Sequence, residues 1–424
     1  GAYANVALAK ELRHGQLSDM DRRFVTELVY GAVKAGGTLD WIIKKYLTRP
    51  WNKVNPLVQE ILRLGIYQLR YMDKVPASAA CNESVELAKK FTNLGAAKFV
   101  NGVLRTMVRE PEKGNFPQGK GNATLQLALS QQHPEWLVRR WIKEFGYEEA
   151  EKLCQFDNQQ APLTVRTNTL KTSPSELFLQ LTSLGVEATR SQLVDEGYIL
   201  ENYGSLDNLA PLQDGYCQVQ DESSMLVAHV VDPQPGELVL DVCSAPGGKT
   251  THMAALMENR GRIVACDIYD HKLQRVMENA ARLGINIIDP MLKDAREIHQ
   301  DFSQQADRVL VDAPCSGLGV LRRKPDSRWR KTQQLLKELP ELQLEILQSA
   351  AACVKPGGIL VYSTCTIARE ENQAVVEKFL KDNAKFQLEH TGSRLPVPRE
   401  DAMVQLYPQR DGTDGFFIAC MRRK

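Results

Sequence analysis

Two of the nine cysteines in the sequence directly follow apolar runs that have the composition of buried strands. Cys315 lies in VDAPCSGLG (311–319), and Cys365 lies in VYSTCTIAREEN (361–372). A single cysteine is more often a small buried apolar residue than a nucleophile. Because the carboxyl ends of parallel strands meet at one edge of a sheet, two cysteines so placed favour a shared site in which a thiolate attacks a substrate.

A third apolar run leads into a turn of small residues, in GELVLDVCSAPGGKTTHMA (236–254). The strand is expected to end at Asp241, and a helix is expected to begin near Lys249. Gly247 and Gly248 lack side chains, so we expect their backbone to approach a ligand closely. The turn matches neither GxGxxG nor GxxxxGK[ST], so the nicotinamide and nucleotide-phosphate interpretations lose their main support.

Two acidic residues follow the next two predicted strands and favour an adenosine-containing ligand. Asp267 ends GRIVACD (261–267), where a carboxylate accepts hydrogen bonds from a ribose diol. Asp294, in KDARE (293–297), is placed to accept a hydrogen bond from an adenine amino group. A helix N-cap is an equally good interpretation of Asp294.

Methylation of cytosine at carbon 5 is a reaction that would use this set of residues. Carbon 5 is a poor nucleophile until a thiolate adds to carbon 6 and breaks the conjugation of the ring. Asp312, if it carries a proton, is placed to donate it to ring nitrogen 3. A second thiol can then assist loss of the proton from carbon 5 and release of the product, so two cysteines would have two roles.

The segments DVCSAPGGKT, DAPCSG and YSTCT, in this order, resemble the Sun-type RNA cytosine-C5 methyltransferase family. The resemblance implies that S-adenosylmethionine is the cofactor, that Cys365 is the nucleophile and that Cys315 promotes product release. It implies that Lys249 lies near the reaction centre, with Lys293 or a neighbour as an alternative to Asp294 for the adenine contact. The cofactor pocket would be lined by Ser244, Ala245, Pro246, Gly247, Gly248, Lys249, Thr250, Asp267, Asp294 and Asp312.

The first quarter of the chain has the three- and four-residue apolar spacing of successive helices, as in Phe24, Val25, Leu28 and Val29. DRRFVTELVYGAVK (21–34) and EILRLGIYQLRYMDKVP (60–76) resemble the NusB-like RNA-binding helical fold. That resemblance places another helix before Gly1, and it suggests the bacterial 16S rRNA branch of the family. The polar segment EPEKGNFPQGKGN (110–122) is expected to be a linker.

The remaining chain divides into two further predicted domains. We expect an all-α NusB-like domain over residues 1–120 and a small α+β, RRM-like subdomain with leading helices over residues 121–235. Residues 236–424 alternate short apolar runs with helical stretches, which indicates a parallel, helix-covered sheet. The predicted fold class is therefore α/β, with a Rossmann-like S-adenosylmethionine methyltransferase domain at its carboxyl end.

Any RNA contact must come from local basic patches, because the net charge of the chain is only +1. Residues 1–112 contain 17 Lys and Arg against 11 Asp and Glu. In RRKPDSRWRK (322–331) we expect phosphate contacts and base stacking, although a solvated basic surface and a packed tryptophan are alternatives. The residues concerned are Arg322, Arg323, Lys324, Arg328 and Trp329.

Composition excludes several classes of protein. No stretch approaches the roughly 18 apolar residues of a membrane span, and the first residues do not form a secretory signal. The cysteines form no CxxC pair, so we expect free thiols in a reducing, cytoplasmic compartment and no metal. The resemblance to the family implies an enzyme whose partner is 16S ribosomal RNA, and we expect it to be a monomer. The alternatives are a transfer RNA cytosine methyltransferase with the same chemistry and, less favoured because both cysteines are present, a non-catalytic RNA-binding factor.

Overall fold

The computed structural model describes residues 4–14 and 17–424. The chain forms two compact units, one made of residues 1–159 with 321–331 and the other of residues 160–320 with 332–424. The backbone therefore passes between the units three times. We refer to them as the helical unit and the sheet unit.

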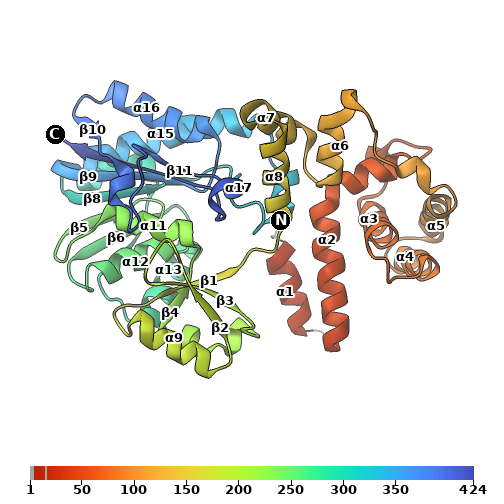
Figure 1. The fold of residues 1–424 in the computed structure, drawn as a ribbon, viewed down its shortest axis with the longest axis horizontal. Coiled ribbons are helices and arrows are strands. Elements are labelled where there is room, and N and C mark those ends of the chain that lie inside the picture. Colours follow the sequence, from red (N-terminus) through yellow and green to blue (C-terminus); the bar gives the residue numbers. More distant parts are fainter. Residues whose placement is uncertain (1–3, 15–16) are drawn as a thin grey trace. The chain divides into compact units, whose positions relative to one another are not determined.

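The helical unit contains α-helices and short 3-10 turns (Figure 1). Ser18, Asn55 and Asn93 cap three of its helices by accepting a hydrogen bond from a backbone N–H of the first turn. The apolar faces of α2, α3 and α5 meet in one core, as the sequence spacing predicts. The helices are α1 (Ala4–His14), α2 (Asp19–Lys44), α3 (Pro56–Tyr71), α4 (Ala77–Phe91), α5 (Leu94–Arg109), α6 (Ala123–Ser130), α7 (Glu135–Phe145) and α8 (Tyr147–Asn158).

The helical unit continues past residue 120, where we expected a boundary, to residue 159. Helices α6 to α8 were expected to accompany the subdomain that follows them. Instead, Leu129 and Trp141 are buried within the helical unit, and Thr38 of α2 donates a hydrogen bond of 3.4 Å to the Leu129 carbonyl. The unit is completed by residues 321–331, which include the 3-10 helix η6 (Pro325–Trp329).

The sheet unit begins with a four-stranded antiparallel sheet in the order β2-β3-β1-β4. Its strands are β1 (Leu163–Thr167), β2 (Glu187–Arg190), β3 (Gly197–Glu201) and β4 (Cys217–Val219), and α9 (Pro174–Ser183) packs against them. A capping box at Ser173 and Glu176 starts α9. The α+β character predicted for this region is confirmed.

The larger sheet has eight strands, in the order β10-β12-β9-β8-β5-β6-β7, with β11 paired to β12. The pairs from β9 to β7 along this order are parallel, whereas those of β12 are antiparallel. The strands are β5 (Leu238–Asp241), β6 (Arg262–Asp267), β7 (Ile288–Leu292), β8 (Ala306–Asp312), β9 (Val354–Thr364), β10 (Phe386–Leu388), β11 (Val404–Leu406) and β12 (Phe416–Arg423).

Helices cover both faces of this sheet (Figure 1). On one face α11 (Glu222–Val231), α12 (Gly248–Leu256) and α13 (Asp270–Leu283) build a core, and on the other α15 (Leu335–Cys353) and α16 (Gln373–Asp382) build a second. Strands buried on both faces need continuous apolar runs, which is why the sequence revealed them. Because β6 and β8 flank β5 on opposite sides, a crevice is expected where the carboxyl end of β5 meets its neighbours.

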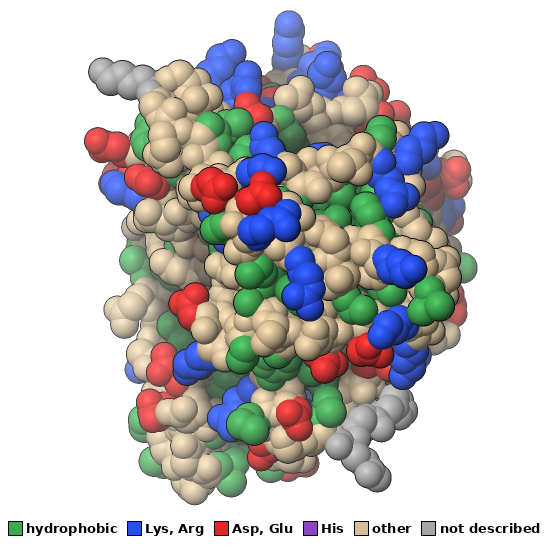
Figure 2. Space-filling model, turned by 90° about the vertical axis from the view of Figure 1, so that its right-hand side faces the viewer, with side chains coloured by type: hydrophobic (Ala, Val, Ile, Leu, Met, Phe, Trp, Pro, Cys, Tyr) green, Lys and Arg blue, Asp and Glu red, His purple; other side chains and the backbone are tan. Residues whose placement is uncertain are grey.

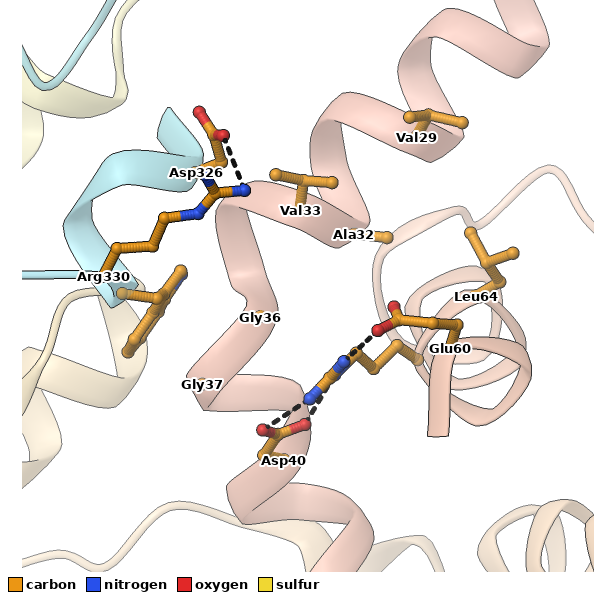
Figure 3. Close-up of a pocket in the computed structure, with 12 residues that line it drawn as sticks. Val29, Ala32, Val33, Gly36, Gly37, Asp40, Glu60, Leu64, Asp326 and Arg330 are labelled. Atoms are coloured by element: carbon orange, nitrogen blue, oxygen red, sulfur yellow. Dashed lines mark hydrogen bonds and ion pairs between the residues drawn. The ribbon is translucent and has the colours of Figure 1, made fainter. Parts of the chain in front are cut away.

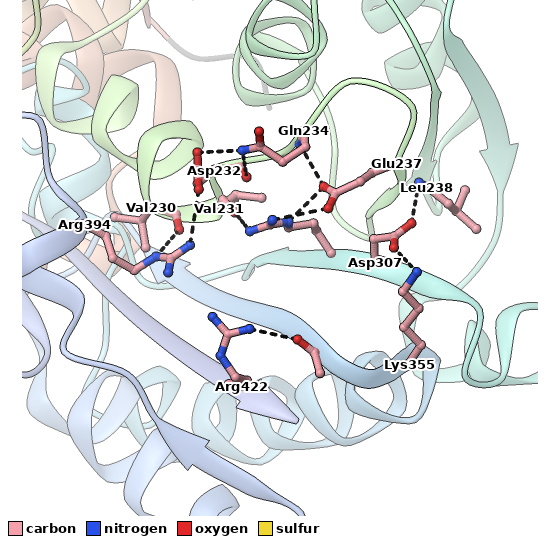
Figure 4. Close-up of polar contacts among 12 residues, drawn as sticks. Val230, Val231, Asp232, Gln234, Glu237, Leu238, Asp307, Lys355, Arg394 and Arg422 are labelled. Carbon is pink, nitrogen blue, oxygen red and sulfur yellow. Dashed lines mark hydrogen bonds and ion pairs between the residues drawn. The ribbon is translucent and has the colours of Figure 1, made fainter. Parts of the chain in front are cut away.

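Ion pairs occupy the opposite edge of the sheet, at the amino ends of the central strands (Figure 4). Arg308 pairs with Glu237 at 2.9 Å, and Asp307 accepts a hydrogen bond of 2.9 Å from the Leu238 backbone and pairs with Lys355. These contacts hold β5 beside β8.

Candidate active site

The turn after β5 is held by hydrogen bonds from its own small residues. Thr250 donates to the Asp241 carboxylate at 2.7 Å, and both the backbone N–H and the hydroxyl of Ser244 donate to the Cys266 carbonyl. Burial raises the pKa of Asp241 to about 7. The turn is therefore a rigid link between β5, β6 and α12.

Gly247 has a structural reason to be glycine. Its φ is +99°, in the left-handed region, and an added Cβ would lie 3.1 Å from the Val276 Cα in α13. The approach of its backbone to a ligand stays a prediction, and the direction in which a side chain would point is filled by α13. Its small size allows α12 and α13 to pack closely.

A cavity of about 630 Å³ opens at the carboxyl ends of β5, β6 and β8. This volume lies within the usual range for small-molecule sites. Of the residues expected to bind the cofactor, Ala245, Asp267, Asp294 and Asp312 line it, and so do Cys315 and Cys365. The other expected turn residues lie outside the lining: Ser244, Pro246, Gly247, Gly248, Lys249 and Thr250.

Asp267 and Asp294 both line the cavity, but different contacts hold their carboxylates. One Asp267 oxygen accepts a hydrogen bond of 3.0 Å from the Tyr269 backbone. Asp294 caps the 3-10 helix η5 (Ala295–Glu297) and forms an ion pair of 2.7 Å with Arg296, whose side-chain hydrogen bond lowers the pKa of Asp294. The N-cap interpretation of Asp294 thus describes its local structure. Lys293 instead pairs with Asp301 at 2.9 Å.

The two thiols that follow β8 and β9 are neighbours. Cys315 Sγ and Cys365 Sγ lie 3.3 Å apart, and both side chains are partly exposed to the cavity. The hydrogen bond to Cys365 and burial raise the pKa of Cys315 well above its usual value, and the negative charge of Glu371 adds to this effect. Cys315 is therefore held as the neutral thiol.

Lys249 and Asp312 form an ion pair next to the thiols, 2.7 Å between Nζ and Oδ2. The second oxygen of Asp312 accepts a hydrogen bond of 2.8 Å from Ser363. Burial alone would lower the pKa of Lys249, but the charge and hydrogen bond of Asp312 raise it above the usual value. Asp312 thus accepts hydrogen bonds at both oxygens rather than donating one.

The basic segment after the Cys315 loop packs within the helical unit. Arg328 is fully buried, and it donates hydrogen bonds to the Gln132 and Asp157 carbonyls and to the Asn158 side chain. The expectation that Arg328 binds RNA phosphate is therefore wrong, because its donors are used in the protein interior. Arg322 lies over the Phe156 ring at 4.4 Å.

Trp329 fits the packing interpretation. Its indole N–H donates to the Lys34 carbonyl at 2.9 Å, and its ring covers Gly36 and Gly37 of α2, where an added Cβ on Gly37 would lie 2.3 Å from the ring. Figure 3 shows the pocket beside this contact, in which η6 and Arg330 face α2. Trp329 anchors residues 321–331 to the helical unit.

Several residues of the site were not predicted from the sequence. Ile268 and Tyr269 line the cavity directly after Asp267, a position that could have been suspected because it follows a strand end. Gly319 donates its backbone N–H to the Cys365 carbonyl at 3.0 Å and accepts one of 2.8 Å from Gly415. Only the fold brings Gly319 and Gly415 together.

One further cluster consists of residue types that can bind a metal, and it includes a residue of α12, the helix that follows the turn after β5. Glu196, His229 and His252 bring their ligand atoms within 4.8 Å of one another. His229 Nε2 and His252 Nε2 lie 2.5 and 2.9 Å from the same Glu196 oxygen, and the buried Arg166 cation is close to His252. These hydrogen bonds account for the arrangement without an ion, and they tie α11 and α12 to the smaller sheet.

In the part of the chain that the structure describes, every helix is too short or too polar to cross a membrane. The doubly covered sheet, the turn after its first strand and the adjoining cavity define a Rossmann-like methyltransferase. The chain belongs to the 16S rRNA methyltransferase RsmB/F family, which it matches over residues 228–422. It also matches the NusB family over residues 1–109 and the RsmF/B-like ferredoxin-like domain over residues 133–207.

Relatives match the chain over its full length. It is 41% identical to the probable ribosomal RNA small subunit methyltransferase B of Bacillus subtilis, covering 100% of this chain and 95% of the relative. The corresponding protein of Synechocystis is 39% identical, with coverages of 100% and 96%. The crystal structure of PH0851 is similar with a TM-score of 0.85 and 30% identity, covering 97% of this chain and 92% of PH0851.

A second solved structure, NSun6 from Pyrococcus horikoshii with SFG, has a TM-score of 0.62 and 26% identity. It covers 68% of this chain and 98% of the NSun6 chain. The predicted family and fold class are thereby confirmed.

Proposed function

We propose that this protein transfers a methyl group from S-adenosylmethionine to carbon 5 of a cytosine in 16S ribosomal RNA, with Cys365 as the covalent nucleophile. The observation that carries the proposal is the pair of sulfur atoms 3.3 Å apart, lining one cavity with Asp267 and Asp312. Membership in the family and the names of the full-length relatives support ribosomal RNA as the substrate.

The two cysteines have different roles in the covalent reaction. The Cys365 thiolate forms a bond to carbon 6 of the ring, and the displaced electron pair makes carbon 5 nucleophilic. After carbon 5 has gained the methyl group, solvent water accepts the proton of carbon 5, and the electrons of that C–H bond re-form the double bond between carbons 5 and 6 as the Cys365–carbon 6 bond breaks. Cys365 leaves as a thiolate, and Cys315, held as a neutral thiol 3.3 Å away, assists this release by donating a hydrogen bond to it.

The Lys249–Asp312 pair supplies charge and a proton donor to the ring. We expected a protonated Asp312 to donate to nitrogen 3, but here both of its oxygens accept hydrogen bonds. We infer that the ammonium of Lys249, oriented by Asp312, provides the positive charge that stabilises the ring during attack. Asp312 then acts by fixing Lys249 beside the thiols.

The residues of the cavity fit an adenosine-containing methyl donor. Asp267 would hold the ribose diol, and Asp294, already ordered by Arg296, would lie beside the adenine. S-adenosylmethionine, when bound, supplies the electrophilic methyl group. Val242, Ala295 and Leu342 add apolar lining to the cavity.

The helical unit is the proposed RNA-binding part. On the face shown in Figure 2, Lys and Arg side chains are interspersed with apolar, uncharged and acidic ones. Helices α4 and α5 contribute five exposed basic side chains: Lys89, Lys90, Lys98, Arg105 and Arg109. Such charges bind phosphates without reading sequence. The cytosine must leave its stack to reach Cys365, so an unpaired or flipped base is the expected substrate.

The test offers methyl-labelled S-adenosylmethionine with unmodified 16S rRNA and, separately, with unmodified transfer RNA, followed by mapping of the label. Label on carbon 5 of one rRNA cytosine is the expected result. If the label appears on carbon 5 of a cytosine in transfer RNA alone, the proposed substrate is wrong and the proposed reaction mechanism stands. Label on an exocyclic amino group would overturn the covalent mechanism, because that reaction does not need a thiolate.

A further inference from the structure

Glu371 is a buried carboxylate directly behind the two cysteines. It ends the 3-10 helix η7 (Arg369–Glu371), and its side chain has no exposed surface. Its oxygens accept hydrogen bonds from the Ser316 backbone N–H at 2.8 Å and from the Ser316 hydroxyl at 2.5 Å. Ser316 is the residue that follows Cys315, so Glu371 holds the loop that carries one of the two thiols.

The same carboxylate also holds the loop of the other thiol. Thr366, which follows Cys365, donates its hydroxyl to Glu371 at 3.2 Å, and the Ser316 and Thr366 hydroxyls lie 2.8 Å apart. One side chain is thus bonded to the residue immediately after each cysteine. Gln343 of α15 closes the arrangement by donating both to Glu371 at 3.0 Å and to the Pro314 carbonyl at 2.9 Å.

Burying a carboxylate among neutral donors is costly. A buried charge loses its hydration, and hydrogen bonds from hydroxyl, amide and backbone groups offset that loss only in part. A neutral side chain of similar size would connect the loops at lower cost. We therefore expect the negative charge itself to have a role. Two nearby groups respond to it, the Cys315 thiol and the Tyr362 phenol, and the charge helps to raise the pKa of each.

We propose that Glu371 is a positioning residue for the thiol pair, which holds the Cys315 and Cys365 loops together and keeps the two sulfur atoms in different roles. Its negative charge opposes formation of a second thiolate at Cys315, so only Cys365 acts as the nucleophile. The catalytic meaning of this role rests on the proposed function. The state of the thiols can be measured without RNA.

The first test measures alkylation of Cys315 by iodoacetamide against pH, with peptides resolved by mass spectrometry. In Glu371→Gln the midpoint of the pH profile should fall by about one unit, equivalent to a tenfold rise in thiolate fraction at a fixed pH below the midpoint. If the substitution only loosened the fold, the rate of Cys315 alkylation would rise at all pH values and the midpoint of the pH profile would not change. An unchanged midpoint overturns the role of the charge.

Asp307→Asn is the matched control. Asp307 also joins two strands by accepting a backbone hydrogen bond, but it lies at the opposite end of β8 (Figure 4). Asp307→Asn should lower thermal stability and leave the Cys315 midpoint unchanged. A shift of the midpoint in this control as large as that in Glu371→Gln would overturn the proposal.

A second variant separates the hydrogen bonds from the charge. Ser316→Ala removes one hydroxyl partner of Glu371 and keeps the carboxylate, so the Cys315 midpoint should stay at the wild-type value. In both Ser316→Ala and Glu371→Gln, kcat should fall about fivefold or more while KM for RNA changes less than twofold, because the thiols lose alignment. Wild-type kcat in both variants overturns the positioning role.

These measurements distinguish failure of the proposal from failure of the proposed function. If the wild-type protein does not methylate RNA but the Cys315 midpoint shifts as expected, the proposed function fails and the effect of Glu371 on the thiols stands. If methylation occurs and the midpoint does not move, the role of Glu371 fails and the function stands.

Discussion

Cys315 Sγ lies 3.3 Å from Cys365 Sγ, although 49 residues separate the two cysteines in the chain. Parallel strands β8 and β9 bring them together, because each cysteine follows the carboxyl end of its strand. The roles that we propose for the two cysteines need this proximity, since one sulfur would be bound to the ring while the other assists its release.

Replacing either cysteine should give opposite results on a denaturing gel with labelled RNA. Cys365→Ala should abolish methyl transfer and form no adduct. Cys315→Ala should leave RNA attached through Cys365, because attack occurs and release does not. Cys353→Ala, which alters a buried cysteine of α15, is the control and should retain turnover. Full turnover by Cys365→Ala would exclude it as the nucleophile.

Breaking the Lys249–Asp312 pair should affect both catalysis and stability. Lys249→Met leaves a largely buried carboxylate without its cation, which should lower the free energy of unfolding by about 2 kcal/mol. It should also lower kcat by at least about tenfold if Lys249 stabilises the ring during attack. Urea unfolding and single-turnover methylation measure the two effects, and unchanged single-turnover rates would contradict the role of Lys249.

The contribution of His252 to the stability of the sheet unit should fall on acidification below pH 6.5. Burial, and then the nearby Arg166 cation, lower the pKa of His252 to about 3 in the folded protein, against 6.5 when unfolded. The unfolded chain therefore binds an additional proton between these values. The stability contributed by neutral His252 is fully present above pH 6.5 and falls towards pH 3, with a limiting slope of about 1.4 kcal/mol per pH unit. Asp241, whose pKa burial raises to about 7, acts in the opposite direction, so the effect of His252 is measured as a difference between the wild type and a variant.

The measurement is urea unfolding at pH 7, 5.5 and 4.5, compared with His252→Gln. Glutamine can still donate to Glu196 but does not titrate, so the variant should show a shallower dependence on pH. Asp241, whose pKa is raised to about 7 by burial, remains in the variant and contributes to its residual slope. Equal slopes for the variant and the wild type would show that His252 does not carry the effect.

Two residues of the 321–331 segment should separate folding from RNA binding. Arg328→Ala removes three hydrogen bonds from a buried site and should lower the stability of the helical unit by about 3 kcal/mol. Lys324→Ala changes an exposed side chain, so stability should stay the same while the salt dependence of RNA binding weakens by about one phosphate contact. Thermal unfolding and salt titrations measure both effects. A Lys324 variant with wild-type salt dependence would exclude Lys324 from the RNA contact.

The sequence predicted the parallel sheet and the position of both cysteines because each signal is local. Strands buried on both faces require apolar runs, and Cys315 and Cys365 follow two of them directly. The burial of Arg328 could not be predicted, since its partners at 132, 157 and 158 are more than 160 residues away in the chain. Basic composition alone suggested a surface contact, whereas tertiary structure placed the residue in the interior.

The same contrast between local and long-range features holds for the site. Asp267 ends β6, and its place at the cavity was predicted from that position. The contacts of Glu371 with the cysteine loops were not predicted, because they depend on β8, β9 and α15 together. The left-handed φ of Gly247 agrees with the sharp turn expected of it, whereas its close packing against α13 could not be predicted from the sequence. A glycine that permits close packing of two helices has the same sequence signature as one that admits a ligand.

The helical unit is built from two stretches of chain, residues 1–159 and 321–331, which has a consequence during synthesis. A ribosome that has translated the first 300 residues carries this unit without Arg328 and Trp329, so the contacts that these two residues make with the Asp157 carbonyl and with Gly36 and Gly37 have not yet formed. The first unit to emerge is thus completed only after residues 160–320 of the sheet unit have been translated. A fragment that ends at residue 159 would remain in that unfinished state, whereas supplying residues 321–331 as a separate peptide should raise its melting temperature.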